Sequence, residues 1–424
     1  MVVTRMQGLG SFASALLLGA GLVGCGAPTP PGNTGGTDVP PGACGRGVVT
    51  FSSDYQSTNT SLVDWEGKVL SASLLSSAST APQLSVPLSG DVVAPTMPAA
   101  GDRITIIDRY PGSVLTWVDV KLGQVTAQLS VATGFKANPQ DYAEITSKKA
   151  YVSRLDPNLA PGMAPFDAGS DVLVVDPSQP AITGRIDLAP AMSGEDPKYY
   201  PRPNRIALVD GRAIVLLSSL SLSFMDSLSS RLVTIDTATD AIVSVRVLDG
   251  LHGCTGLALS PNGKRVAVSC SGTFANDQMS NIDQSGLAVL ARSGDTLTEE
   301  RRVAAADLGG GPLGFAVSFA TDDSVVFTTF GRDASGGAPA LDDTVTQVDV
   351  TTGHHEVVLR SQGTPFTLGD VRCAGECPVC FATDAGIDGG VLHRFDVEGG
   401  ALVRGTTVRV DASIGLPPRY LGRF

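Results

Sequence analysis

One strand–turn–strand pattern recurs along the chain and is clearest from Ser230 to Leu248. The apolar residues Leu232, Val233 and Ile235 lead to Asp236, a short turn follows, and a second apolar stretch runs from Ile242 to Val247. Short apolar segments separated by turn residues are typical of antiparallel β-hairpins. Related hairpins begin at Ser61, Val114, Asp171, Ser285, Thr344 and Val391. The pattern therefore predicts a repetitive all-β architecture.

Each of these hairpins is preceded by another hairpin. The clearest example runs from Cys254 to Cys270, where two apolar strands flank the turn Pro261–Gly263. Seven four-stranded units at this spacing predict a seven-bladed β-propeller. The first unit lacks a first strand, and the chain continues past the seventh unit with Gly415–Phe424. We expect this C-terminal segment to supply the missing strand and close the first blade.

Six of the seven units carry an Asp at the end of the third strand. These are Asp64, Asp119, Asp176, Asp236, Asp349 and Asp396. An Asp carboxylate can accept the backbone N–H two residues ahead and so stabilise a tight turn. We therefore interpret the six residues as turn formers and not as catalytic carboxylates.

The connections between second and third strands are long in four units, and most other turns are short. The long ones are Leu155–Gly169, Ser219–Ser229, Ser271–Ser285 and Gly331–Asp342. Because strand directions alternate, these insertions share one side of the ring, which we call the long-loop face, and the short turns share the opposite, short-turn face. Insertions favour the long-loop face for binding. Candidate binding residues on that face are Arg154, Asp156, His252, Asn276, Asp277, Arg332, Asp333 and Asp384.

The N-terminus reads as a targeting segment. Residues 1–24 carry one basic residue and an apolar, small-residue-rich stretch that ends before Cys25. The sequence Leu22-Val23-Gly24-Cys25 resembles a bacterial lipobox, and this resemblance implies cleavage to leave a lipidated Cys25. Gly26 then favours outer-membrane sorting, and the alternative is an ordinary signal peptide with an incidental cysteine. Residues 25–43 are rich in Pro and Gly, which predicts a flexible tether before a propeller over residues 44–424.

Six further cysteines form an even set, which suggests disulfides in an exported protein. From their positions on the predicted hairpins we expect the pairs Cys254–Cys270, Cys373–Cys380 and Cys44–Cys377. Cys377 and Cys380 also form a CxxC motif, which can bind zinc or carry redox chemistry. The hairpin context opposes a redox role, and His393 is a remote candidate for a zinc ligand. A structural disulfide is the preferred interpretation.

The repeated apolar-apolar-Asp phrase resembles that of YVTN-type and NHL-like propellers, which are relatives of the WD-repeat class. This resemblance implies the fold and leaves the activity open, because such propellers host many functions. No nucleophile-elbow, zinc-protease or P-loop motif occurs, so we predict no catalytic residue, metal ligand or cofactor. The formal net charge of −12 argues against nucleic acid.

We expect a monomeric, lipid-anchored binding scaffold of the cell envelope, which contacts the membrane through its lipid alone. The alternative is a propeller hydrolase or lactonase with its site at the mouth of the central channel.

Overall fold

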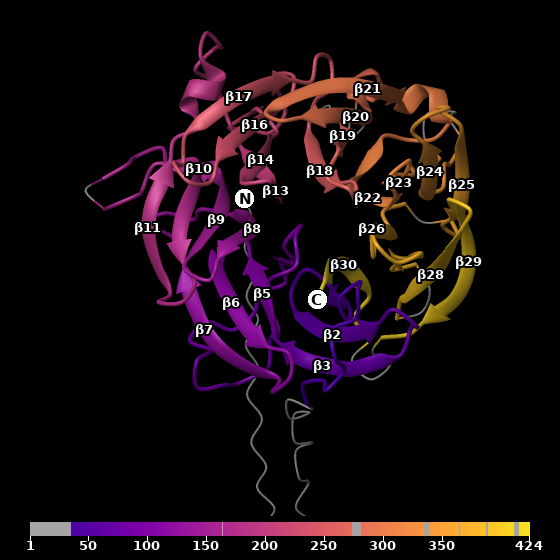
Figure 1. Cartoon of the computed structure of the whole chain (residues 1–424), viewed down its shortest axis with the longest axis horizontal. Helices are drawn as coiled ribbons and strands as arrows, with labels where there is room; N and C mark the ends of the chain where they lie inside the picture. The colour runs from indigo at the N-terminus through magenta and orange to yellow at the C-terminus, as the bar shows by residue number, and fades with distance from the viewer. Residues whose placement is uncertain are drawn as a thin grey trace, which may run out of the picture.

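The computed structural model describes residues 35–162, 164–273, 281–334, 339–363, 365–386, 389–410 and 415–424. Over these residues the chain forms seven four-stranded antiparallel sheets, arranged as blades around a central axis (Figure 1). The predicted seven-bladed propeller is confirmed. No helix in the described part of the chain is long and apolar enough to cross a membrane.

Each blade runs from an innermost strand at the channel to an outermost strand at the rim. In that order, blades 1 to 3 comprise β30 (Pro418–Arg423), β1 (Gly47–Ser53), β2 (Thr58–Asp64) and β3 (Val69–Ser76); β4 (Val92–Val93), β5 (Arg103–Asp108), β6 (Val114–Asp119) and β7 (Gln124–Ser130); and β8 (Pro139–Thr146), β9 (Lys149–Pro157), β10 (Gly169–Asp176) and β11 (Ala181–Ile186).

Blades 4 and 5 comprise β13 (Pro203–Val209), β14 (Arg212–Leu217), β16 (Arg231–Asp236) and β17 (Ile242–Val247); and β18 (Cys254–Leu259), β19 (Arg265–Ser271), β20 (Ser285–Ser293) and β21 (Thr296–Ala304). Blades 6 and 7 comprise β22 (Leu313–Thr321), β23 (Ser324–Thr329), β24 (Thr344–Asp349) and β25 (His355–Arg360); and β26 (Leu368–Cys373), β27 (Val379–Asp384), β28 (Val391–Glu398) and β29 (Ala401–Val408). A separate two-stranded sheet joins β12 (Tyr199–Tyr200) to β15 (Leu220–Ser221).

Burial along the strands follows their position in the blade. The second strands β1 and β23 are buried at every residue, because adjacent blades cover both of their faces. The outermost strands are only half covered, and in β17 Val243 and Val245 are each 42% exposed. The core is therefore a series of aliphatic layers between blades, built mainly from Val, Leu and Ile.

The C-terminal strand closes the ring as predicted. In Figure 1 the yellow β30 lies beside the indigo strands of blade 1. It pairs antiparallel with β1, with Val48 opposite Arg423 and Thr50 opposite Leu421. A Cβ at Gly422 would overlap the Cβ of Ala94 in the next blade, so glycine permits the close approach of β30 to blade 2.

The three predicted disulfides are confirmed. Cys254–Cys270 joins β18 to β19, and Cys373–Cys380 joins β26 to β27. Cys44–Cys377 connects the segment before β1 to blade 7, with the two Cα atoms 5.8 Å apart. Disulfides are typical of proteins from oxidising compartments, which favours an extracytoplasmic location.

Five of the six repeated Asp residues form turns as predicted. Asp236 is typical, because its Oδ1 accepts the backbone N–H groups of Ala238 and Thr239 at 2.9 and 3.0 Å. Asp119, Asp176 and Asp349 accept similar bonds, and Asp64 accepts the N–H of Lys68 at the far side of its turn.

Asp396 is the exception, and its assignment as a turn former was wrong. Strand β28 continues past Asp396 to Glu398, and the Asp396 carboxylate pairs with Arg394 at 2.8 Å. The turn is displaced to Gly399 and Gly400, whose positive φ angles of 59° and 90° glycine tolerates without strain.

Candidate functional site

The innermost strands line the central channel, and their channel-side N–H groups lack a further strand to pair with. Side chains from the neighbouring blade satisfy several of them. The carboxylate of Asp141 accepts the N–H of Ile206 at 2.7 Å, and that of Asp370 accepts the N–H of Leu421 at 2.9 Å. These bonds tie β8 to β13 and β26 to β30.

The channel collects arginines although the chain as a whole is acidic. Arg205 on β13, Arg372 on β26 and Arg423 on β30 all lie on inner strands. Burial lowers the pKa of Arg205, with Asp141 opposing the shift and Arg372 adding to it. Burial and the Arg372 guanidinium likewise lower the pKa of Arg423, with Glu376 opposing. The folded channel therefore disfavours the charged forms of Arg205 and Arg423.

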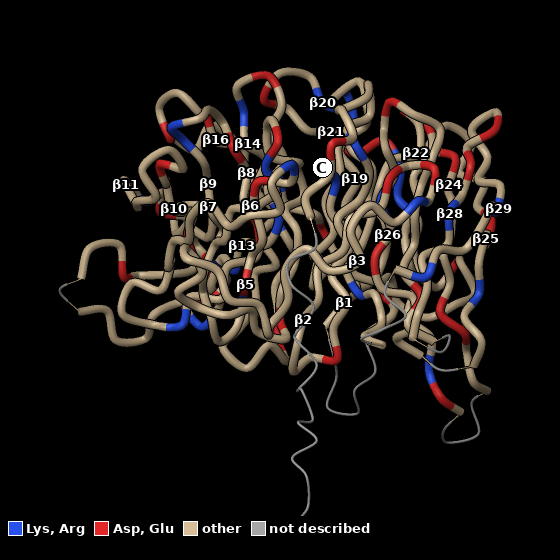
Figure 2. Tube along the Cα trace, turned by 90° about the horizontal axis from the view of Figure 1, so that it is seen from below, with Lys and Arg blue, Asp and Glu red and all other residues tan. Residues whose placement is uncertain are grey.

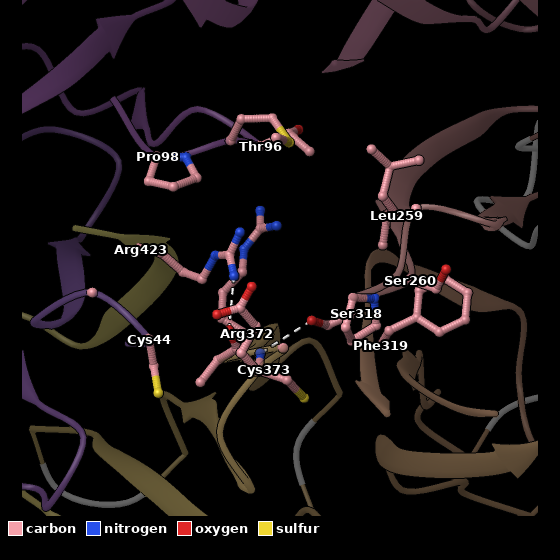
Figure 3. A pocket seen from close by; sticks show the side chains of 18 of the residues that line it. Cys44, Thr96, Pro98, Leu259, Ser260, Ser318, Phe319, Arg372, Cys373 and Arg423 are labelled. Atoms are coloured by element: carbon pink, nitrogen blue, oxygen red, sulfur yellow. Dashed lines mark hydrogen bonds between the residues drawn. The ribbon is translucent and has the colours of Figure 1, made fainter. Parts of the chain in front are cut away.

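At the short-turn face the channel opens into a cavity of about 650 Å³. Its walls come from the inner-strand turns of blades 4 to 7, from the loop after β4 and from the segment around Cys44. Figure 3 shows the guanidinium groups of Arg372 and Arg423 side by side in this cavity, with Pro98 and Leu259 on opposite sides of them. Figure 2 shows acidic and basic residues alternating in the turns at the edge where the C-terminus lies.

At the long-loop face the opposite mouth is narrower and aromatic. The ring of Phe330 lies 4.9 Å from that of Phe315 and 5.1 Å from that of Phe366, measured between centroids. Phe315 is 43% and Phe366 53% exposed, whereas Phe330 is buried beneath them. Arg419 stacks on the exposed ring of Tyr55 at 5.0 Å. Together these residues border a cavity of about 100 Å³.

Two of these aromatic residues have unusual backbone conformations. Tyr55 and Phe366 have φ angles of 66° and 63°, a left-handed region that bulky residues rarely adopt. The buried carboxylate of Asp343 accepts the N–H groups of Phe366 and Thr367, at 3.0 and 2.6 Å, and so fixes that loop. Strain of this kind is often maintained at binding sites.

Two predicted binding residues of blade 3 are engaged by other side chains. Arg154 is fully buried and forms a two-pronged ion pair with Asp171, at 2.8 and 2.7 Å. Asp156 forms an ion pair with the buried Arg202, whose guanidinium stacks on Phe224 at 4.3 Å.

His252 lies between β17 and β18, where its Nδ1 is 2.8 Å from the Oγ of Ser227. Burial lowers the pKa of its imidazole, against the opposing effects of a hydrogen bond with the Ser227 backbone and of Asp226. Burial therefore favours the neutral imidazole.

The remaining predicted residues come from other blades. Arg332 forms an isolated bridge with Leu341, and Asp333 follows it in the exposed loop after β23. Asp384 is buried, and its Oδ2 lies 2.9 Å from the Nε2 of His393. Cys25, Asn276 and Asp277 lie outside the described residues.

Among the described members of the predicted set, no hydrogen bond or ion pair joins one to another. Their role in binding stays a prediction.

The cysteines in and near the CxxC motif are not available as zinc ligands. Cys373, Cys377 and Cys380 are all in disulfides, which removes the thiolates that zinc requires. Within the described ranges no group of three or more His, Cys, Asp or Glu residues is arranged to hold a metal ion.

Sequence reasoning considered the channel mouth as a site but did not find the arginines or aromatic residues that form the two mouths. Arg372 and Arg423 stand in the short segments DVRC and LGRF, where a basic residue interrupts an inner strand. A charged residue inside an innermost strand was the available signal. The aromatic mouth gave no such signal, because Phe315, Phe330 and Phe366 are far apart in the chain and only the fold brings them together.

No known family model matches the chain, and no curated protein matches it in sequence. Several solved structures share its fold. A "putative 6-phosphogluconolactonase" from Bacteroides fragilis is 11% identical, with a TM-score of 0.56 over 89% of this chain and 97% of its own. A counterpart of the same description from Bacteroides uniformis has a TM-score of 0.57 at 11% identity, over 89% and 98%.

The β-propeller domain of Cps50 (Swd1) from Myceliophteria thermophila is 13% identical, with a TM-score of 0.51 over 79% of this chain and 91% of its own. Likeness at such low identity establishes the fold alone. The chain is therefore similar both to two putative 6-phosphogluconolactonases and to the β-propeller domain of Cps50 (Swd1), and the comparisons assign it to the β-propeller fold.

Proposed function

We propose that this chain is a lipid-anchored binding protein of the bacterial cell envelope, which captures a segment of a partner protein at its long-loop mouth. The observation that carries the proposal is the aromatic cluster there, with Phe315 and Phe366 exposed over the buried Phe330. Exposed aromatic groups beside arginines are typical of the energetic centres of protein interfaces.

The chemistry of the mouth defines the partner segment. Arg419 and Arg205 border the aromatic cavity. A peptide that combines apolar and acidic side chains would bury its apolar groups on the rings and place its carboxylates near the guanidinium groups. The small volume, about 100 Å³, suits one inserted side chain and not a whole small-molecule ligand.

The orientation of the ring supports this assignment of faces. The segment before β1 runs along the short-turn face, where the N–H of Thr37 donates to the carbonyl of Val120 at 2.7 Å and Cys44 lines the larger cavity. An anchor at Cys25 followed by a flexible tether would then leave the long-loop mouth turned away from the membrane.

A photo-crosslinking amino acid at position 366, introduced in living cells, tests the proposal. We expect one defined adduct whose crosslinked peptide is apolar and acidic, and we expect Phe315→Ala to reduce its yield about tenfold or more, as removal of an interface anchor does. Leu122, exposed in the turn between β6 and β7 on the opposite face, is the matched control position. Equal adducts at positions 366 and 122, or an adduct insensitive to Phe315→Ala, would contradict the proposal.

The anchor has a separate test. Replacement of Cys25 by Ser should move the chain from the membrane fraction to the soluble envelope fraction. Retention in the membrane fraction after this change would rule out the lipid anchor without affecting the binding proposal.

A further inference from the structure

In the short-turn cavity, two arginines each donate a hydrogen bond to a main-chain carbonyl close to the other arginine. Arg372 Nε donates to the carbonyl of Leu421 on β30 at 3.1 Å. Arg423 Nη1 donates to the carbonyl of Ala374, just after β26, at 2.9 Å. Each guanidinium is thus fixed to a main-chain carbonyl of the other arginine's blade, and both reach into the cavity (Figure 3).

The acids around this pair leave its charge incompletely balanced. The nearest carboxylate oxygen of Asp370 lies 3.7 Å from Arg372 Nε. Both oxygens of Asp370 already accept backbone N–H groups, from Val371 at 2.8 Å and from Leu421 at 2.9 Å. Glu376 is exposed at the rim. Two guanidinium groups therefore face the same partly dry space, where like charges repel more strongly than in water.

We propose that this cavity binds the oxyanion of an amphiphilic organic acid or phosphate ester between Arg372 and Arg423. Planar guanidinium groups bind carboxylate and phosphate oxygens in pairs, and such an anion would offset the repulsion between them. Pro98, Leu259 and Met97 supply apolar walls for the rest of the molecule. The volume of about 650 Å³ lies in the range of small-molecule sites.

This site is separate from the aromatic mouth. It lies at the opposite end of the channel, and its charged residues lie near the ends of β26 and β30 on the short-turn side. Each of the two proposals can therefore fail without the other.

Calorimetric titration of the full-length Cys25→Ser chain with octanoate and octyl phosphate tests the proposal. We expect both anions to bind and their affinity to fall as salt is raised, because the contact is ionic. Octyl glucoside and octylamine have the same alkyl chain without an anionic group and should not bind. Binding of the glucoside as tightly as the phosphate, or no binding of either anion at millimolar concentration, would overturn the proposal.

Variants locate the site. Arg372→Gln and Arg423→Gln should each weaken octyl phosphate binding at least about tenfold, the loss expected for one charge-assisted contact. Arg302→Gln is the matched control, since Arg302 pairs with Glu299 on the outer strand β21. Met97→Glu offers a variant outside the strands, and its carboxylate should also weaken binding. Unchanged affinity in Arg423→Gln would exclude the site.

The same oxyanion can belong to a free metabolite or to a lipid headgroup. Vesicles of phosphatidylcholine with and without phosphatidylglycerol, mixed with the same chain, distinguish the two sources. Flotation with the anionic vesicles that is lost in Arg423→Gln assigns a headgroup, whereas binding of octyl phosphate without flotation assigns a free ligand. Absence of both overturns the proposal.

Discussion

Arg154 is fully buried and the Arg372–Arg423 pair is partly buried, and the surroundings of the two are opposite. Arg154 meets the buried carboxylate of Asp171 through two nitrogen atoms and also donates to two main-chain carbonyls and a hydroxyl. Arg372 and Arg423 lie side by side in a cavity, and each donates to a main-chain carbonyl. The fold itself neutralises the charge of Arg154. The guanidinium groups of Arg372 and Arg423 remain available to pair with a bound anion.

This difference separates structural cations from candidate binding cations in one protein. A buried ion pair matters for stability mainly because removal of one member leaves the other charge buried and unpaired. A pair of like charges in a cavity costs free energy, and a ligand can recover that cost. Burial alone, which the two kinds share, does not distinguish them.

The largest effect should come from Arg154→Met. It leaves Asp171 buried with only Arg185 as an ionic partner, so we expect a loss of about 3–5 kcal/mol in the free energy of unfolding. Chemical unfolding measures this loss. The half-exposed Arg185 gives the control, since Arg185→Met should cost no more than about 1 kcal/mol. Equal losses in the two variants would show that the buried Arg154–Asp171 pair contributes no more to the free energy of unfolding than the Arg185–Asp171 pair.

A smaller effect should follow removal of the Cys44–Cys377 disulfide by serine at both positions. We expect a loss of about 2–4 kcal/mol under non-reducing conditions, together with weaker oxyanion binding, because this bond fixes one wall of the short-turn cavity. The Cys254–Cys270 bond spans 16 residues instead of 333. Its removal should also lower the unfolding temperature but leave anion binding intact, and parallel losses of binding would refute the link to the cavity wall.

The smallest effect on stability should come from Arg423→Met. It removes one hydrogen bond but also a charge that the fold resists, so the free energy of unfolding should change by less than about 1 kcal/mol. Arg46→Met, at the same mouth, is the contrast, because Arg46 is buried and paired with Asp102. Thermal unfolding without added anions measures both. A large loss in Arg423→Met would assign Arg423 to the structural class.

The repeated hairpins carried enough information to predict the fold. Strand alternation, the Asp-containing turns and the unpaired first unit led to seven blades, the closing strand and the disulfide pairs. Asp396 was misassigned because its repeat looks like the others, while a two-glycine turn three residues later takes over its role. The local pattern fails at Asp396 because the neighbouring glycines, Gly399 and Gly400, form the turn without strain.

The candidate sites were much less predictable. Loop length and polarity pointed to residues such as Arg154 and Asp384, but hydrogen-bond partners from other strands engage both of them. Arg423 and Arg372 lie 51 positions apart, and their juxtaposition depends on β30 lying beside blade 7 in the closed ring. Such contacts between distant segments are set by tertiary geometry, which hydrophobic periodicity does not encode.

Strand β30 also couples closure of the ring to the short-turn site. Arg423 lies on β30, which pairs with β1 and packs against β26, so the arginine pair exists only while this seam is shut. Opening of the seam would separate Arg423 from Arg372 and dismantle half of the site. Ligand binding there would in turn stabilise the closed ring, because it favours the state that holds both arginines.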